Sequence, residues 1–82
     1  MILLDVYSPA AGRTWDIVAD EHAEVREMVS DLTSMISVML YGTTGTEVTG
    51  FSLYSVDDHK DLPMYMTLSE CGITDGRRLL LI

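Results

Sequence analysis

Hydrophobic and polar residues alternate along the first part of the chain, which is the pattern of strands with one buried face. Two segments show this alternation, residues 2–7 and residues 14–18. The side chains expected to face the core are Ile2, Leu4, Val6, Trp15 and Ile17. The turn-forming residues Pro9 and Gly12 separate the two segments. This part of the chain is therefore predicted to form a β-hairpin.

After residue 20 the hydrophobic spacing lengthens to the three- and four-residue period of an amphipathic helix. The apolar stripe expected to pack on the sheet consists of Val25, Met28, Val29, Leu32, Met35, Ile36 and Met39. Asp20 is predicted to cap the start of this helix, where Glu21 and Glu24 suit the positive end of the helix dipole. Gly42 is placed to end the helix, and residues 42–50 are expected to form a mobile loop.

The second half of the chain is expected to contain shorter strands. Residues 51–56 form one whose facing stays open, because both Phe51 with Leu53 and Tyr54 with Val56 could point inward. The remaining elements are a turn at 57–63, a short edge strand within 62–66, a polar connection at 67–76 and a final strand at 78–82.

This order of elements favours one sheet with a long helix packed across one of its faces. A hairpin whose following helix leads to a strand on the far side of the first strand has the allowed, right-handed crossover. The predicted fold class is α+β, a β-grasp (ubiquitin-like) roll with a mixed sheet of four to five strands. Residues 1–82 are expected to form a single domain of this kind.

The net charge and the length of the chain restrict the classes of function that we expect. Thirteen acidic residues against five basic ones give a net charge of −8, which opposes nucleic acid and anionic membrane surfaces. A basic or hydrophobic protein surface is the favoured partner. A domain of this size has a stability on the order of 4–12 kcal/mol, which leaves little for strained catalytic geometry. We expect a binding protein and not an enzyme, without catalytic residues.

The candidate chemical groups favour structural roles. Cys71 is the only cysteine, so an intramolecular disulfide and a thiolate zinc site are both excluded, and a reducing compartment is favoured. We interpret Cys71 as a half-buried small residue and not as a reactive thiol. His59 and its neighbouring aspartates are interpreted as a solvated turn, so no metal site and no cofactor are predicted. With no membrane-spanning run and no signal sequence, the expected location is the cytoplasm.

The C-terminal segment "TLSECGITDGRRLLLI" resembles the end of ubiquitin, and more closely that of the YukD/EsaB family. These small bacterial ubiquitin-like proteins are encoded with type VII (ESX-like, WXG100-exporting) secretion systems. The resemblance is specific over residues 68–82 and extends to the rest of the chain in element order. It implies that Leu68 and Ile73 plug the core, that Gly72 is left-handed, and that Leu79 and Leu81 face the helix.

The last residues of the sequence indicate whether the protein can be attached covalently to other proteins, as ubiquitin is. Ubiquitin-like modifiers and sulfur carriers need a flexible tail that ends in Gly-Gly, whereas this sequence ends at Ile82 within the expected last strand. A modifier or sulfur carrier is therefore the alternative only if a tail has been removed. A second alternative is an excised N-terminal ubiquitin-like domain from a membrane component of the same machinery.

The exposed side of the last strand provides the candidate binding site. If Leu79 and Leu81 are buried, Leu80 and Ile82 face outward, where ubiquitin has its main recognition patch. Leu3, joined by Tyr7 or Tyr54, is expected to extend them into a protein-binding patch. The predicted function is that of a non-conjugating accessory or regulatory protein of a type VII secretion system. It would bind protein components of the machinery and reach the membrane only through a partner, and a weak homodimer is the other use of the patch.

Overall fold

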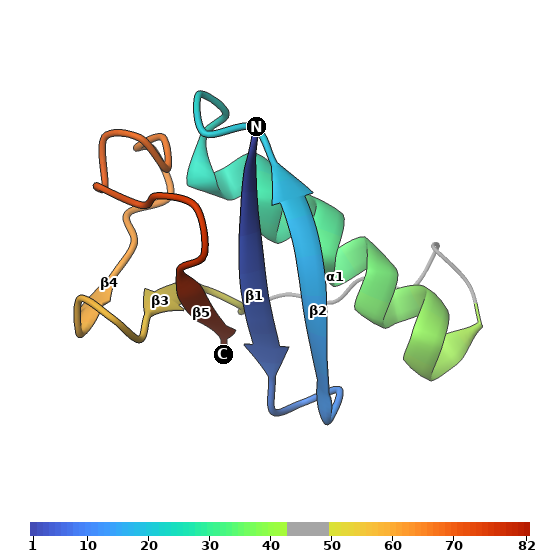
Figure 1. Ribbon diagram of the computed structural model, residues 1–82. Coiled ribbons are helices and arrows are strands. Elements are labelled where there is room, and N and C mark those ends of the chain that lie inside the picture. Colours follow the sequence, from blue (N-terminus) through green and yellow to red (C-terminus); the bar gives the residue numbers. More distant parts are fainter. Residues whose placement is uncertain (43–49) are drawn as a thin grey trace.

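The computed structural model describes residues 1–42 and 50–82, and shows a helix crossing behind a sheet (Figure 1). The elements are β1 (Ile2–Ser8), β2 (Arg13–Ala19), α1 (Val25–Tyr41), β3 (Leu53–Ser55), β4 (Lys60–Asp61) and β5 (Arg78–Leu81). The sheet order is β2-β1-β5-β3-β4, with β1 parallel to β5 and the other neighbours antiparallel. The predicted β-grasp roll with a mixed sheet is confirmed.

The N-terminal hairpin forms as the alternation predicts. Leu4 and Val6 of β1 are fully buried and lie opposite Ile17 and Trp15 of β2, which are partly buried. Together with apolar side chains from α1, β3 and β5 they form the core between the sheet and the helix. The other side of the hairpin faces away from the helix, so no described element covers this face of the sheet, which we call the open face.

The helix begins later than predicted, and Asp20 is not its cap. Glu24 is the N-cap, with an extended backbone, and the Glu27 carboxylate accepts the N–H of Glu24 at 3.2 Å. Asp20 accepts the N–H of His22 at 2.9 Å in a preceding turn. The N–H groups of the first two helical residues donate to carbonyls of the 64–66 segment at 2.8 and 3.0 Å. The helix start is therefore set by the Glu24–Glu27 capping box together with a tertiary contact, and not by a cap at Asp20.

The apolar stripe is confirmed except at Met35. Val25, Met28, Val29, Leu32 and Ile36 are buried, Met39 is partly buried, and Met35 is 43% exposed. Met35 lies beside β2, which is the edge strand of the sheet that the described residues form, so no described strand covers it there. The predicted end of the helix is confirmed, since Gly42 has a φ of 72° and donates its N–H to Val38 at 2.8 Å. Of the loop predicted at 42–50, residues 43–49 lie outside the described residues.

The structure settles the facing of the strand that the sequence left open. Leu53 and Ser55 are buried and Tyr54 faces outward, so β3 presents its odd-numbered residues to the core. The predicted edge strand within 62–66 is wrong, because β4 lies at Lys60–Asp61. Leu62 is buried in the core, and residues 63–66 form a turn closed by a 3.2 Å bond from Met66 to the Pro63 carbonyl.

The connection before β5 is a compact core plug. Leu68, Cys71 and Ile73 are all buried, and the N–H of Ile73 donates to the Leu68 carbonyl at 3.0 Å. Gly72 has a φ of 77°, which confirms the expected left-handed backbone. Cys71 is more deeply buried than the sequence suggested. Within the ranges 1–42 and 50–82, no helix has the length and apolar character needed to cross a bilayer.

Candidate protein-binding surface

The last strand presents two different faces. Leu79 and Leu81 are 1% and 0% exposed and point toward the helix, as predicted. Leu80 is partly exposed on the opposite face, and Ile82, just past the strand, is 49% exposed. This alternation is the geometry of a strand that has the core on one side and the solvent on the other.

The sheet register places Leu80 between two tyrosines. Leu80 pairs with Tyr7 of β1 on one side and with Tyr54 of β3 on the other, so three large side chains form a row across the open face. Ile82 lies next to this row, because it exchanges backbone hydrogen bonds of 2.8 and 3.0 Å with Ser52. We call Tyr7, Tyr54, Leu80 and Ile82 the outer patch.

Leu3 lies apart from the outer patch. It is 46% exposed on the same face, but it pairs with the exposed Val18 of β2 near the opposite end of β1. A charged row made by Asp5, Asp16 and Arg78 separates the two apolar areas. The structure thus brings Leu80 and Ile82 together, and it places Leu3 in a second, smaller apolar pair.

Two carboxyl groups of the charged row lie close together and repel each other when both are ionised. Asp5 lies directly opposite Asp16, and the hydrogen bond between these two carboxyl groups is the main reason that the pKa of Asp5 is raised. Desolvation and the negative charge of Asp16 act in the same direction, and the guanidinium of Arg78 opposes them. Like charges directly opposite each other on neighbouring strands destabilise a sheet.

The acidic turn of residues 57–61 is held by arginines. The Asp57 carboxylate accepts the N–H of Arg78 at 2.9 Å and its guanidinium at 3.0 Å, and these bonds lower the pKa of Asp57. Asp58 pairs with Arg77 at 3.1 Å. The described part of the chain holds no group of three or more side chains suited to bind a metal ion.

Cys71 sits in the core plug, where burial raises the pKa of its thiol. A raised pKa keeps the sulfur protonated at neutral pH, and the thiolate is the reactive form. The side chain therefore serves packing beneath the 67–76 connection.

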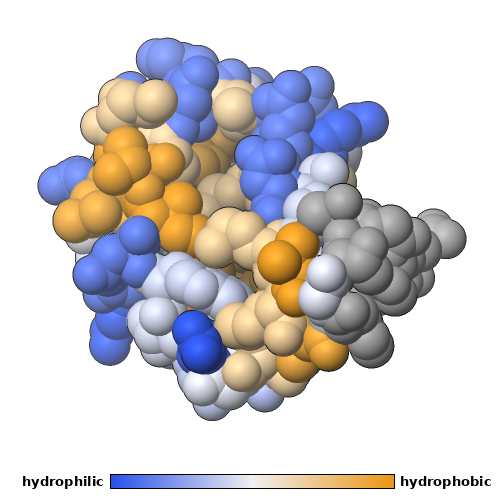
Figure 2. Space-filling model, turned by 90° about the vertical axis from the view of Figure 1, so that its right-hand side faces the viewer, coloured by the Kyte–Doolittle hydropathy of each residue, from blue (hydrophilic) through white to orange (hydrophobic). Residues whose placement is uncertain are grey.

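A groove between β2 and α1 was not predicted from the sequence. It has a volume of about 730 Å³ and is lined by residues of β2, α1 and the turn between them, with Leu68 of the 67–76 connection. Figure 2 views the molecule from the side at which β2 is the edge strand, and it shows a hollow with hydrophobic surface beside a strongly hydrophilic rim. Met35 lines this groove, and for that reason its side chain is exposed although it belongs to the predicted apolar stripe of the helix.

A long helix packed across a mixed sheet in this strand order defines a ubiquitin-like β-grasp protein. Residues 3–81 match the family described as "WXG100 protein secretion system (Wss), protein YukD". The chain belongs to the YukD family and is thus a ubiquitin-like protein associated with type VII secretion. No curated protein matches the chain.

Solved structures share the fold. The EccD5 ubiquitin-like domain from Mycobacterium xenopi is 24% identical with a TM-score of 0.72, and the match covers 99% of this chain and 91% of that one. Ubiquitin from Caldiarchaeum subterraneum is 17% identical with a TM-score of 0.73, over 99% and 90% of the two chains. A chain of the MycP5-free ESX-5 inner membrane complex is 24% identical with a TM-score of 0.71, and the match covers 99% of this chain and 20% of that chain.

Proposed function

We propose that this protein is a non-conjugating accessory or regulatory component of a type VII secretion system that binds another protein non-covalently through the outer patch. The observation that carries the proposal is the row Tyr7, Leu80 and Tyr54, with Ile82 beside it, on the open face of the sheet. Exposed apolar groups gathered on a small protein are typical of a protein-binding site. Leu3 and Val18 form a secondary contact on the same face.

The partner that fits this surface is a protein component of the secretion machinery. Family membership supports the link to secretion, and the net charge of −8 favours a partner with a basic or apolar surface. The likeness to a chain of an inner membrane complex supports a cytoplasmic protein that meets the membrane through its partner. A second candidate is a ubiquitin-like domain of a membrane component, which the likeness to the EccD5 domain favours. The reading frame of the gene separates these two.

Copurification tests the proposal. The protein carries an N-terminal tag at its native locus, is purified under native and under fully denaturing conditions, and its companions are identified by mass spectrometry. We expect secretion-system components in the native sample alone, and we expect Leu80→Asp to remove them. Tyr65→Asp is the matched control, since Tyr65 is an exposed side chain outside the outer patch.

Two results would contradict the proposal. A species that survives denaturation with an added protein mass would show covalent conjugation. Equal recovery of the same companions with wild type and Leu80→Asp would show that the outer patch does not bind them.

A further inference from the structure

The hydrogen bonds of β1 show which backbone N–H and C=O groups of β2 point toward β1 and which point away from the sheet. The Leu3 carbonyl and the Asp5 N–H bond toward the segment before β5, at 2.8 and 3.1 Å. Successive residues of a strand direct their backbone groups to opposite sides, so Leu4 must bond toward β2, where Ile17 is its partner. The odd-numbered residues of β2 therefore pair with β1.

The outer edge of β2 carries the remaining backbone groups, those of Thr14, Asp16 and Val18. None of their N–H and C=O groups has a hydrogen-bond partner in the described part of the chain. An added strand hydrogen-bonds to every second residue of an edge strand, and these three residues have that spacing. They therefore form a template for strand addition. A segment that pairs here would lie beside the helix and place every second side chain toward it.

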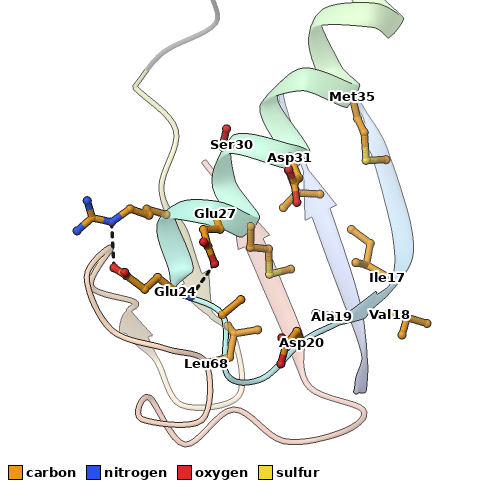
Figure 3. Close-up of a pocket in the computed structure, with 14 residues that line it drawn as sticks. Ile17, Val18, Ala19, Asp20, Glu24, Glu27, Ser30, Asp31, Met35 and Leu68 are labelled. Carbon is orange, nitrogen blue, oxygen red and sulfur yellow. Dashed lines mark hydrogen bonds and ion pairs between the residues drawn. The ribbon is translucent and has the colours of Figure 1, made fainter.

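The groove lies where those side chains would enter. Figure 3 shows Ile17 of β2 and Met35 of α1 approaching each other across it, while Val18 points away on the other side of the strand. Met28 and Leu32 contribute further apolar lining. The side chains suited to this space are aliphatic, and they would cover the exposed part of Met35.

The rim of the groove is acidic. Asp20, Glu24, Glu27 and Asp31 line it, against one basic residue, Arg26. Arg26 is already paired with Glu24 at 3.0 Å, and this pair is drawn in Figure 3. The uncompensated carboxylates favour a ligand that brings positive charge to the ends of its apolar stretch.

We propose that β2 and this groove bind an extended segment of a partner protein in which apolar residues alternate and lysine or arginine flanks them. The segment adds a strand to β2, its inward side chains fill the groove, and its basic residues meet the rim. The outer patch lies on the opposite face of the sheet, so the two sites can be occupied together. The inference does not depend on the outer patch having a partner.

A titration with two synthetic peptides tests the inference. The ¹⁵N-labelled full chain is mixed with KKVTVTVTKK or with EEVTVTVTEE, both blocked at their ends, and amide shifts and amide exchange are followed by NMR. We expect the lysine-flanked peptide to bind at least about tenfold more tightly than the glutamate-flanked one. Its binding should weaken as salt is added. It should shift residues 14–19 and 27–35 and slow exchange at Thr14, Asp16 and Val18.

Two pairs of variants sharpen the test. Asp31→Lys should weaken the binding of the lysine-flanked peptide about three- to tenfold. Asp61→Lys, an equal charge change on β4, should leave this binding unchanged. Val18→Pro removes one free edge donor and should weaken binding, while Val18→Ala keeps the donor. Thermal melts confirm that each variant is folded.

Three results of the peptide titration with the wild-type protein would overturn the inference: no binding of the lysine-flanked peptide, equal binding of both peptides, or shifts that centre on Leu80 instead of β2. Equal weakening by Asp31→Lys and Asp61→Lys would also overturn it, because the effect would then come from net charge alone.

Discussion

At the scale of single residues, Leu80 and Leu81 are adjacent in β5 and have opposite surroundings. Leu81 is fully buried, and a carboxylate in its place would lie in the core without a partner, at a cost of about 4 kcal/mol or more. That cost is comparable with the whole stability of a domain this size, roughly 4–12 kcal/mol. We therefore expect Leu81→Asp to unfold the protein.

Leu80→Asp should leave the fold intact, because Leu80 is partly exposed on the open face of the sheet. We expect it to change the free energy of unfolding by about 1 kcal/mol or less. Urea denaturation followed by circular dichroism measures both variants. Unfolding by Leu80→Asp would show that the two faces of β5 are assigned wrongly.

Alternation along the sequence predicted this pair, and it also predicted the buried positions of Leu4 and Val6. It could not predict that Leu3 lies apart from Leu80, because that separation depends on the register between the parallel strands β1 and β5. Nor could it predict that Met35 is exposed. A helical stripe shows which residues share a face, whereas the width of the covering sheet decides which of them are buried.

At the scale of elements, the core plug of residues 67–76 depends on a backbone conformation. Gly72 has a φ of 77°, and a Cβ atom placed there would meet nothing within 4 Å. The cost of Gly72→Ala is therefore conformational and not steric, and we expect a loss of about 1–2 kcal/mol. Chemical denaturation measures it.

The control for this prediction is Gly72→Asn, because asparagine tolerates the left-handed region better than alanine. It should lose less stability than Gly72→Ala. If the two variants lose the same amount, the destabilisation has another cause than the backbone angle.

The facing carboxylates of β1 and β2 predict a pH effect. The raised pKa of Asp5 means that the folded state holds this proton more tightly than the unfolded state, so ionisation of Asp5 costs stability. We expect Asp5→Asn to be more stable than wild type at pH 7. The difference should shrink as the pH falls through the raised pKa of Asp5, because the wild-type carboxyl then becomes neutral as well.

Thermal melts of wild type and Asp5→Asn between pH 3 and 7 test this. Asp61→Asn removes the same charge from β4, where the residue opposite is Tyr54 and not a carboxylate. An equal gain from Asp61→Asn would attribute the effect to the net charge of the molecule.

Most elements could be predicted from the sequence, and the differences occur where distant segments meet. The start of the helix at Val25 combines the local cap of Glu24 and Glu27 with hydrogen bonds to the segment around Met64 and Met66, and a local capping rule does not contain the second of these. In the same way, β4 lies at Lys60–Asp61, and Leu62 after it is buried in the core while its N–H still bonds the Leu53 carbonyl of β3 at 2.9 Å. The groove beside β2 also requires knowledge of how the helix lies on the sheet.

At the scale of the whole molecule, the sheet separates two surfaces of different chemistry. The outer patch is apolar and partly aromatic, and the groove on the helix side has an acidic rim. Two surfaces on opposite sides of the sheet are compatible with the simultaneous binding of two partners, as the proposed accessory role and the proposed strand addition together require.

The most direct test of the central claim is the export of a WXG100 substrate from cells in which the chromosomal gene carries Leu80→Asp. We expect secreted substrate to fall to the level of a deletion strain while the variant protein accumulates normally, and we expect Tyr65→Asp to secrete like wild type. Wild-type export with Leu80→Asp, at equal protein levels, would contradict the claim that the outer patch is the functional surface.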